Sequence, residues 1–138
     1  MTRPVLFSSC LAILALVLGG CGKPPRTEDP DTSNLRRIYQ AIRTSFDVRE
    51  RPPHDEAELK HWLGQLGEKG SPDDFLISRR DKKPFVIYYD AAKHPDAGDT
   101  IVAHEAEGVN GKKLVLTLRP SVTEMTDAEI AARKPGKK

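Results

Sequence analysis

The chain has 138 residues, of which 22 are basic and 20 acidic, so its formal net charge at pH 7 is only +2. A surface that binds nucleic acid needs a clustered excess of basic residues, and this balance argues against one. The length suits one domain with a single modest core.

The first twenty residues have the features of an export signal. Arg3 gives the N-terminus a positive charge, and the run from Val5 to Leu18 is apolar except for Ser8, Ser9 and Cys10. Such a run has the length of a signal peptide's apolar region and is shorter than the roughly 20 residues of a membrane-spanning helix. We therefore expect residues 1–20 to be a signal peptide that is removed.

The run ends in Leu18-Gly19-Gly20-Cys21, which resembles the lipobox of bacterial lipoproteins. The resemblance implies cleavage between Gly20 and Cys21, a diacylglycerol on the Cys21 thiol and an amide-linked fatty acid such as palmitate. Two or more chains hold a protein stably on a membrane, whereas one chain binds only marginally. The alternatives are an ordinary secretory signal followed by a chance cysteine, and a short buried helix.

A lipidated Cys21 also predicts where the protein works. The domain would lie outside the cytoplasm, on a membrane surface. Gly22 follows the cysteine, and it is not the aspartate that retains some lipoproteins at the inner membrane. If the source is Gram-negative, the outer membrane and periplasm are therefore favoured.

This processing would use both cysteines of the chain. Cys10 leaves with the signal, and Cys21 carries the lipid. The remaining domain then has neither a free thiol nor a disulfide, although its compartment is oxidising. This excludes thiolate metal sites and cysteine nucleophiles, and it leaves packing to stabilise the fold.

Two helices are predicted after a flexible tether that covers residues 21–33, where proline, glycine and charge dominate. From Asn34 to Arg49 the apolar residues recur with a helical period. They are Leu35, Ile38, Tyr39, Ile42 and Phe46. We expect the N-cap among residues 32–34, and we expect Arg51-Pro52-Pro53 to end the helix, because the residue before a proline avoids helical angles.

The second predicted helix begins at an N-cap, Asp55, with Glu58 completing a capping box. It ends at Gly67, a residue that tolerates the conformation just past a helix. Its apolar stripe is Leu59, Trp62, Leu63 and Leu66. Because Trp62 shares this stripe, we interpret it as a core residue and not as a platform for a ligand.

From residue 75 onward the pattern favours strands. The expected strands are 75–78, 84–89, 100–105 and 112–118, with a short edge strand at 122–125. Asn110-Gly111 predicts a type I′ hairpin turn, and the capping box Thr126-Asp127-Ala128-Glu129 opens a helix through Ala132. Residues 133–138 read as a basic, disordered tail.

Helices followed by a run of strands predict an α+β fold, with the N-terminal helices on one face of a four-stranded antiparallel meander and a short C-terminal helix. The predicted domain covers residues 34–132.

No catalytic residue, cofactor site or metal site is predicted. The four histidines lack metal-ligand spacing and are interpreted as surface or half-buried residues. They are His54, His61, His94 and His104. The serines lack a nucleophile-elbow context; they are Ser71, Ser78 and Ser121.

Two features leave a binding alternative open. Four aspartates could hold calcium if their loops met, although capping of loops is the simpler interpretation. They are Asp73, Asp74, Asp96 and Asp99. The basic stretch from Arg79 to Lys83 is read as a solvated turn, with a phosphate site as the alternative.

The order of elements resembles the globular head of type II secretion pseudopilins and type IV pilin-like proteins. Asp81, Pro84, Phe85 and Tyr88 match their turn-and-strand motif, whose tryptophan and glycine are lysines here, and Gly98–Val122 is similar to their final hairpin. The likeness covers residues 34–125. A prepilin cleavage site and a long apolar helix are missing, so the resemblance implies an interaction role and not a fibre subunit.

Our hypothesis is a membrane-anchored lipoprotein that acts as a structural or interaction module at the cell envelope, linked to a secretion or pilus-like system. The alternative is a small lipid-anchored ligand-binding or enzyme-inhibitor module. We do not expect an enzyme. The expected partners are the membrane, through Cys21, and a protein whose identity the sequence does not give.

Overall fold

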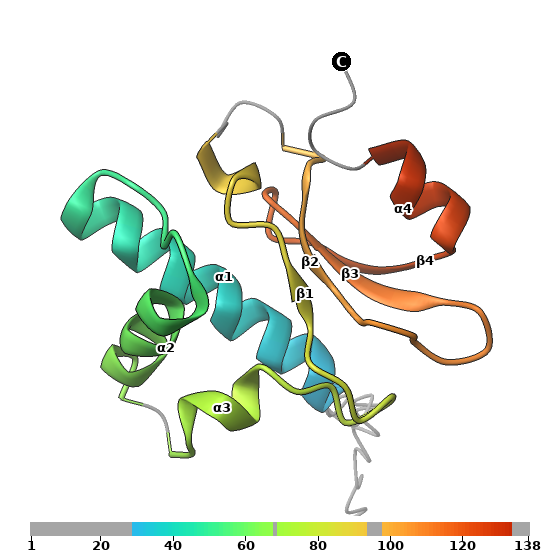
Figure 1. The fold of residues 1–138 in the computed structure, drawn as a ribbon, viewed down its shortest axis with the longest axis horizontal. Helices are drawn as coiled ribbons and strands as arrows, with labels where there is room; N and C mark the ends of the chain where they lie inside the picture. Colours follow the sequence, from blue (N-terminus) through green and yellow to red (C-terminus); the bar gives the residue numbers. More distant parts are fainter. Residues whose placement is uncertain (1–28, 68, 94–97, 134–138) are drawn as a thin grey trace, which may run out of the picture.

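The structure is a computed structural model, and it describes residues 29–67, 69–93 and 98–133. Helices precede and follow a group of four strands (Figure 1). In chain order the elements are α1 (Pro30–Arg49), α2 (Glu56–Gln65), α3 (Pro72–Phe75), β1 (Val86–Ile87), the 3-10 helix η1 (Ala91–Lys93), β2 (Ile101–His104), β3 (Lys113–Thr117), β4 (Val122–Met125) and α4 (Asp127–Arg133). The predicted α+β class is confirmed.

The sheet is an antiparallel meander in the order β1-β2-β3-β4. Its register aligns Val86 with His104, His104 with Val115, and Val115 with Thr123, so that one row of residues crosses all four strands. α1, α2 and α3 lie on one side of the sheet and α4 on the other (Figure 1). The expected placement of the N-terminal helices and the short C-terminal helix is therefore confirmed.

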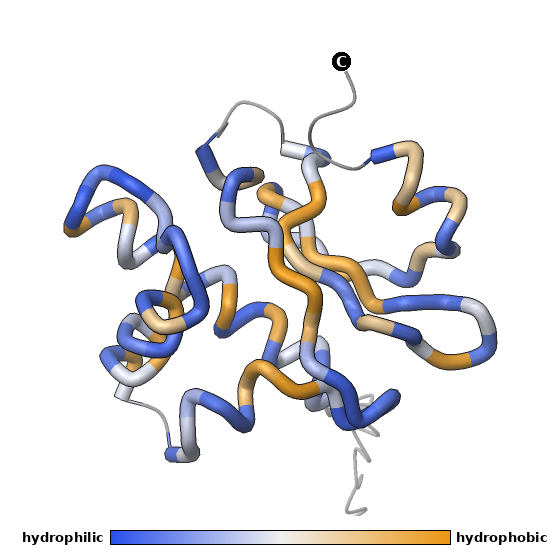
Figure 2. Tube along the Cα trace, viewed as in Figure 1, coloured by the Kyte–Doolittle hydropathy of each residue, from blue (hydrophilic) through white to orange (hydrophobic). Residues whose placement is uncertain are grey.

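Two apolar clusters hold these layers together. The larger lies between the helices and the sheet, and Figure 2 shows hydrophobic stretches along both α1 and β1. It contains Leu35, Ile38, Ala41, Ile42, Leu59, Trp62, Leu63, Phe75, Leu76, Phe85, Val102, Ala103, Leu114 and Leu116. The smaller lies beneath α4 and contains Ile101, Val115, Met125 and Ile130. Trp62 is a core residue, as the sequence predicted.

α1 begins earlier than predicted. The sequence indicated a start at Asn34 after a tether, but the helix starts at Pro30 and includes residues 30–33. The N-cap is Asp29, whose side chain accepts hydrogen bonds from the amides of Asp31 (2.9 Å) and Thr32 (3.4 Å). Aspartate followed by proline at the first helical position is a favourable helix start, which the polar composition of this stretch concealed.

The strand predicted at 75–78 is also wrong. Residues 72–75 form α3, because Ser71 and Asp74 make a reciprocal capping box around Pro72. The extended part that follows is reduced to one antiparallel bridge between Ile77 and Pro84. The fourth strand of the sheet is instead β4, which the sequence offered as an edge addition.

The predicted turn at Asn110-Gly111, the capping box of α4 and the N-cap of α2 are confirmed. Asn110 and Gly111 both have positive φ, 53° and 73°, in the turn between β2 and β3. Thr126 and Glu129 bond reciprocally at the start of α4, which runs through Arg133, one residue past its expected end. Asp55 caps α2 by accepting from the Glu58 amide at 2.8 Å. Within the described ranges no helix has both the length and the apolar character needed to cross a bilayer.

Candidate functional site

A buried polar cluster joins the start of α1 to the sheet. The two carboxylate oxygens of Asp31 accept hydrogen bonds from the successive amides of Arg79 (2.8 Å) and Arg80 (2.9 Å). The Ser78 hydroxyl lies 3.1 Å from Asp31 and 2.9 Å from Glu105. Since a hydroxyl has one proton, Ser78 donates to one of these carboxylates at a time.

The cluster continues into the sheet through Glu105. Its second oxygen accepts the amide of Leu114 at 2.7 Å, and the Arg80 guanidinium lies 3.5 Å from its first. Asp31, Ser78 and Glu105 are almost fully buried. Ser78 therefore has carboxylate neighbours and no exposed face, so a substrate in solution cannot reach it. Buried polar groups need such partners, and the arrangement fixes α1 on the loop before β1.

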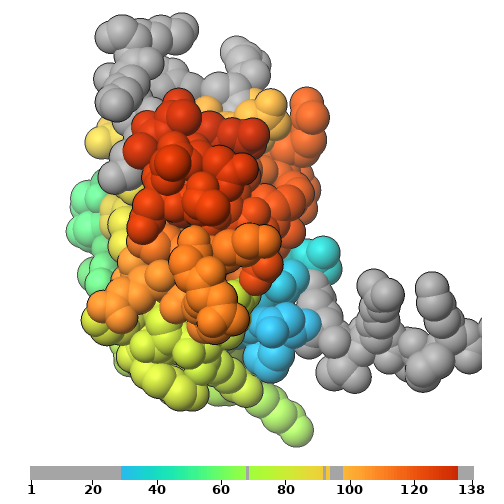
Figure 3. Space-filling view, turned by 90° about the vertical axis from the view of Figure 1, so that its right-hand side faces the viewer, coloured from blue at the N-terminus to red at the C-terminus, as the bar shows by residue number. Residues whose placement is uncertain are grey.

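Asp81 fixes a second contact, between this loop and the β2–β3 hairpin. Its carboxylate accepts the amides of Glu107 (2.8 Å), Gly108 (2.9 Å) and Lys83 (3.0 Å). Burial acts to raise the pKa of Asp81, but these amides outweigh it and hold the pKa below its usual value. Figure 3 shows the orange hairpin lying directly against the yellow-green loop.

The basic turn predicted at Arg79–Lys83 is a turn held by acidic residues. Arg80 pairs with Glu124 at 2.9 Å, and Lys83 pairs with Glu107. These contacts favour the structural interpretation of the stretch over a phosphate site.

Glu58 organises a charged cluster between α1 and α2. It accepts hydrogen bonds from Arg49 (2.5 Å), from both terminal nitrogens of Arg51 (2.8 and 2.7 Å) and from the His54 amide (3.0 Å). The hydrogen bonds from Arg51 hold the pKa of Glu58 well below its usual range. Burial acts to raise this pKa, and the hydrogen bonds from His54 help to lower it. The predicted capping box is thus only half formed, because Glu58 bonds the amide before the N-cap.

The candidate metal ligands are not brought together. His54 contacts Glu58 and Asp55 through its two ring nitrogens, whereas His104 contacts the Tyr88 hydroxyl and the Glu105 carbonyl. His61 packs edge-on against Trp62, and His94 lies outside the described residues. No group of three or more ligating side chains occurs in the described ranges.

Two of the four aspartates offered for calcium act as an ion-pair partner and a cap. Asp73 pairs with Lys60 at 2.7 Å, and this contact lowers the pKa of Asp73. Asp74 accepts the Ser71 amide in the α3 capping box. Asp99 is exposed, and Asp96 lies outside the described residues.

A groove of about 290 Å³ runs beside β1, and we call it the edge groove. Its lining is mainly apolar, with acidic residues from α2 and α3. The lining residues are Leu76, Ile77, Pro84, Phe85, Ile87, Tyr89, Glu56 and Asp73. Phe85, Ile87 and Tyr89 are alternate residues, so they line the groove from the face of β1 that the helices cover,. Because β1 is the first strand of the sheet, the groove lies at the sheet's edge.

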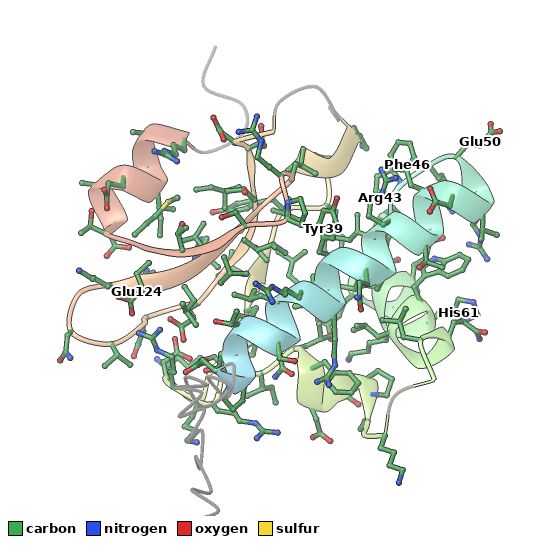
Figure 4. All side chains as sticks on the ribbon, turned by 180° about the vertical axis from the view of Figure 1, so that it is seen from behind. Tyr39, Arg43, Phe46, Glu50, His61 and Glu124 are labelled. Carbon is green, nitrogen blue, oxygen red and sulfur yellow. The ribbon has the colours of Figure 1, made fainter. Side chains whose placement is uncertain are left out.

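A second hollow of about 550 Å³ lies where α1 meets the loop before α2. We call it the proline hollow; it is lined by Phe46, Glu50, Arg51, Pro52, Pro53, His54 and Lys93. Figure 4 shows Phe46 and Glu50 near the end of α1, following Tyr39 and Arg43 along the helix. Its volume falls within the range of small-molecule pockets, whereas the edge groove is at the lower limit of that range.

Sequence reasoning named the lipidation site but neither hollow. Gly20 and Cys21, the expected cleavage and lipidation residues, lie outside the described residues. Both hollows bring together residues from separate elements, which local patterns cannot place. The one available signal for the edge groove was the uncharged run from Val86 to Tyr89, which is unusually apolar for an edge strand. Comparisons with protein-family models, with curated proteins and with solved structures found no match.

Proposed function

We propose that this chain is a bacterial lipoprotein, anchored at Cys21, whose α+β domain is a structural or interaction module at the cell envelope. The observation that carries the proposal is the stretch from Leu18 to Cys21 at the end of an apolar run. We include in the proposal a link to a secretion or pilus-like system. It is supported by the likeness of the segment from Asp81 to Tyr88, a turn followed by β1, to the pseudopilin head.

The early start of α1 sets the distance between anchor and domain. The helix begins at Pro30, so the chain after Cys21 spans at most about 30 Å when fully extended. The cluster around Asp31 fastens this first turn to the sheet. The domain would therefore work close to its membrane, where a partner in the same envelope layer is within reach.

The test is metabolic labelling with a radioactive fatty acid in a bacterial host. We expect the wild type to incorporate label, to be shortened and to partition into detergent, and the Cys21→Ser variant to do none of these. Cys10→Ser is the matched control, since Cys10 lies in the predicted signal, and it should behave as wild type. Labelled, shortened Cys21→Ser protein would refute the proposal.

The proline hollow favours one second candidate, a lipid-anchored ligand-binding or enzyme-inhibitor module. It combines Phe46 and two prolines with the polar groups of Arg51 and His54, as ligand pockets do. Native mass spectrometry of the purified chain should then show a retained small molecule that is lost in Phe46→Asp. The control is Val48→Asp, an exposed position on the same helix. An unliganded mass in both proteins would remove this candidate.

A further inference from the structure

β1 has one paired side and one open side. Tyr88 donates its amide to Val102 of the neighbouring segment at 2.8 Å, and Val86 pairs with His104 in the same register. Hydrogen-bonding direction alternates along an antiparallel strand, so the N–H and C=O of Ile87 point away from the sheet. Outside the strand ladder, this N–H makes no backbone hydrogen bond within the described part of the chain.

The chain itself covers only the beginning of this open side. The Phe85 amide donates to the Leu76 carbonyl at 2.8 Å, and Ile77 bridges to Pro84. Before Leu76 the chain is already in α3. The covering segment therefore ends opposite Phe85, two residues before Ile87, and the edge groove lies beside Ile87.

Apolar surface accompanies the open backbone groups. Ile77 is 43% exposed and Val86 is 37% exposed, two of the largest apolar exposures among the described residues. Natural edge strands are usually protected by charge, proline or cover. From Val86 to Tyr89 the edge carries no charged residue or proline, which is the condition for pairing with a further strand.

The groove's rim is acidic. Glu56 and Asp73 are 62% and 65% exposed, and both contact the single cation Lys60, at 2.5 and 2.7 Å. Two carboxylates thus share one positive charge. Burial raises the pKa of Tyr89 to about 12; the carboxylates of Glu56 and Asp55 add to the shift, and Lys60 opposes it.

We propose that the edge groove binds an extended segment of a partner protein, which adds to β1 as a fifth strand and brings a basic side chain to the net-negative rim formed by Glu56, Asp73 and Lys60. The backbone of the segment bonds Ile87, and an apolar side chain on the opposite face of the segment packs on the exposed Val86,. Strand addition of this kind takes affinity from the main chain and specificity from the alternating side chains. The inference rests on the proposed interaction function and names its partner class.

A second copy of this chain is a less suitable occupant of the groove. Pairing β1 with β1 would bring two sets of Glu56 and Asp73 carboxylates to one interface, each pair sharing a single Lys60, and like charges placed together oppose association,. The proposal therefore commits to a different chain, whose bound segment carries basic side chains.

The experiment uses the full-length chain in detergent micelles. The probe is a fluorescent five-residue peptide that alternates lysine and valine, blocked at both ends. Its twin with glutamate in place of lysine is the comparison. We expect the lysine peptide to bind at least about tenfold more tightly than the glutamate peptide in anisotropy titrations. We also expect it to protect the Ile87 amide from hydrogen exchange.

Two variants locate the binding. Glu56→Lys should weaken the lysine peptide about tenfold, whereas Asp47→Lys, a substitution of an acid that is 67% exposed on α1 outside the groove, should leave binding unchanged. Equal binding of the two peptides, equal loss in the two variants, or an unprotected Ile87 amide would each overturn the proposal. These readouts are independent of lipidation, so failure of the Cys21 test and failure of this one are distinguishable.

Discussion

Two glycines of the β2–β3 hairpin offer a matched test of the fold. Gly108 and Gly111 have nearly the same positive φ, 72° and 73°. A Cβ added at Gly111 meets nothing within 4 Å, but one added at Gly108 would lie 2.2 Å from the Lys112 carbonyl oxygen. Alanine should therefore cost only backbone strain at Gly111, and strain plus a collision at Gly108.

The magnitudes follow from these contacts. Left-handed strain alone predicts a loss of about 1 kcal/mol in the free energy of unfolding for Gly111→Ala. At Gly108 the loop must move as well. This endangers the bond from Val109 N to Lys112 O (2.8 Å) and the bond from Gly108 N to Asp81 (2.9 Å). With about 1 kcal/mol for strain, about 1 for the neutral bond and 1.5–3 for the charged one, Gly108→Ala should lose about 3.5–5 kcal/mol.

Urea unfolding of the full chain in micelles measures both values, with the fluorescence of the single tryptophan, Trp62, as the signal. Gly64→Ala is the control, because Gly64 lies inside α2 with its nearest neighbour, Pro72, at 3.9 Å. Alanine there should stabilise by up to about 1 kcal/mol. Equal losses for Gly108→Ala and Gly111→Ala would show that the close approach of Lys112 is wrong.

Two further predictions concern the carboxylates with lowered pKa values. A carboxyl whose pKa falls on folding stabilises the protein at pH values above its pKa in the unfolded chain, about 4, and this stability is lost as the pH drops. Urea unfolding midpoints measured between pH 6 and pH 3 should therefore fall less steeply in Asp81→Asn than in wild type. Identical slopes in the two proteins would contradict the Asp81 contacts. Glu58→Gln should cost about 1–3 kcal/mol, since the bonds from Arg49 and Arg51 lose their charged acceptor,. Glu129→Gln, a change at an exposed position of α4, is the comparison, and thermal unfolding measures both variants. An equal loss of stability in the two variants would show that the Glu58 ion pairs stabilise the fold no more than an exposed cap does.

The features that the sequence predicted well are those set by neighbouring residues. Asn110-Gly111 forms the expected turn because both residues tolerate positive φ, and Asp55 caps α2 without help from the rest of the chain. The apolar stripes of α1 and α2 identified much of the larger core, including Leu35 and Trp62.

The failures have two physical causes. The first cause is competition between local signals. At 72–78 the cap at Ser71 favoured a helical turn over the predicted strand. At 30–33 Asp29 and Pro30 started α1 inside a stretch whose composition had indicated a tether. Long-range contacts were the second cause. The burial of Asp31 and Glu105 depends on Ser78, far from both in sequence, and charged residues give no local sign of burial.

The buried Asp31 cluster also decides how the domain bears a pulling force. A load applied through an N-terminal anchor enters the domain at Pro30, in the first turn of α1. Asp31 passes it at once to the amides of Arg79 and Arg80, two bonds that share the load side by side. Ser78 and Glu105 carry it on to β3. Tension would therefore reach the centre of the sheet before it could unwind the helix from its end.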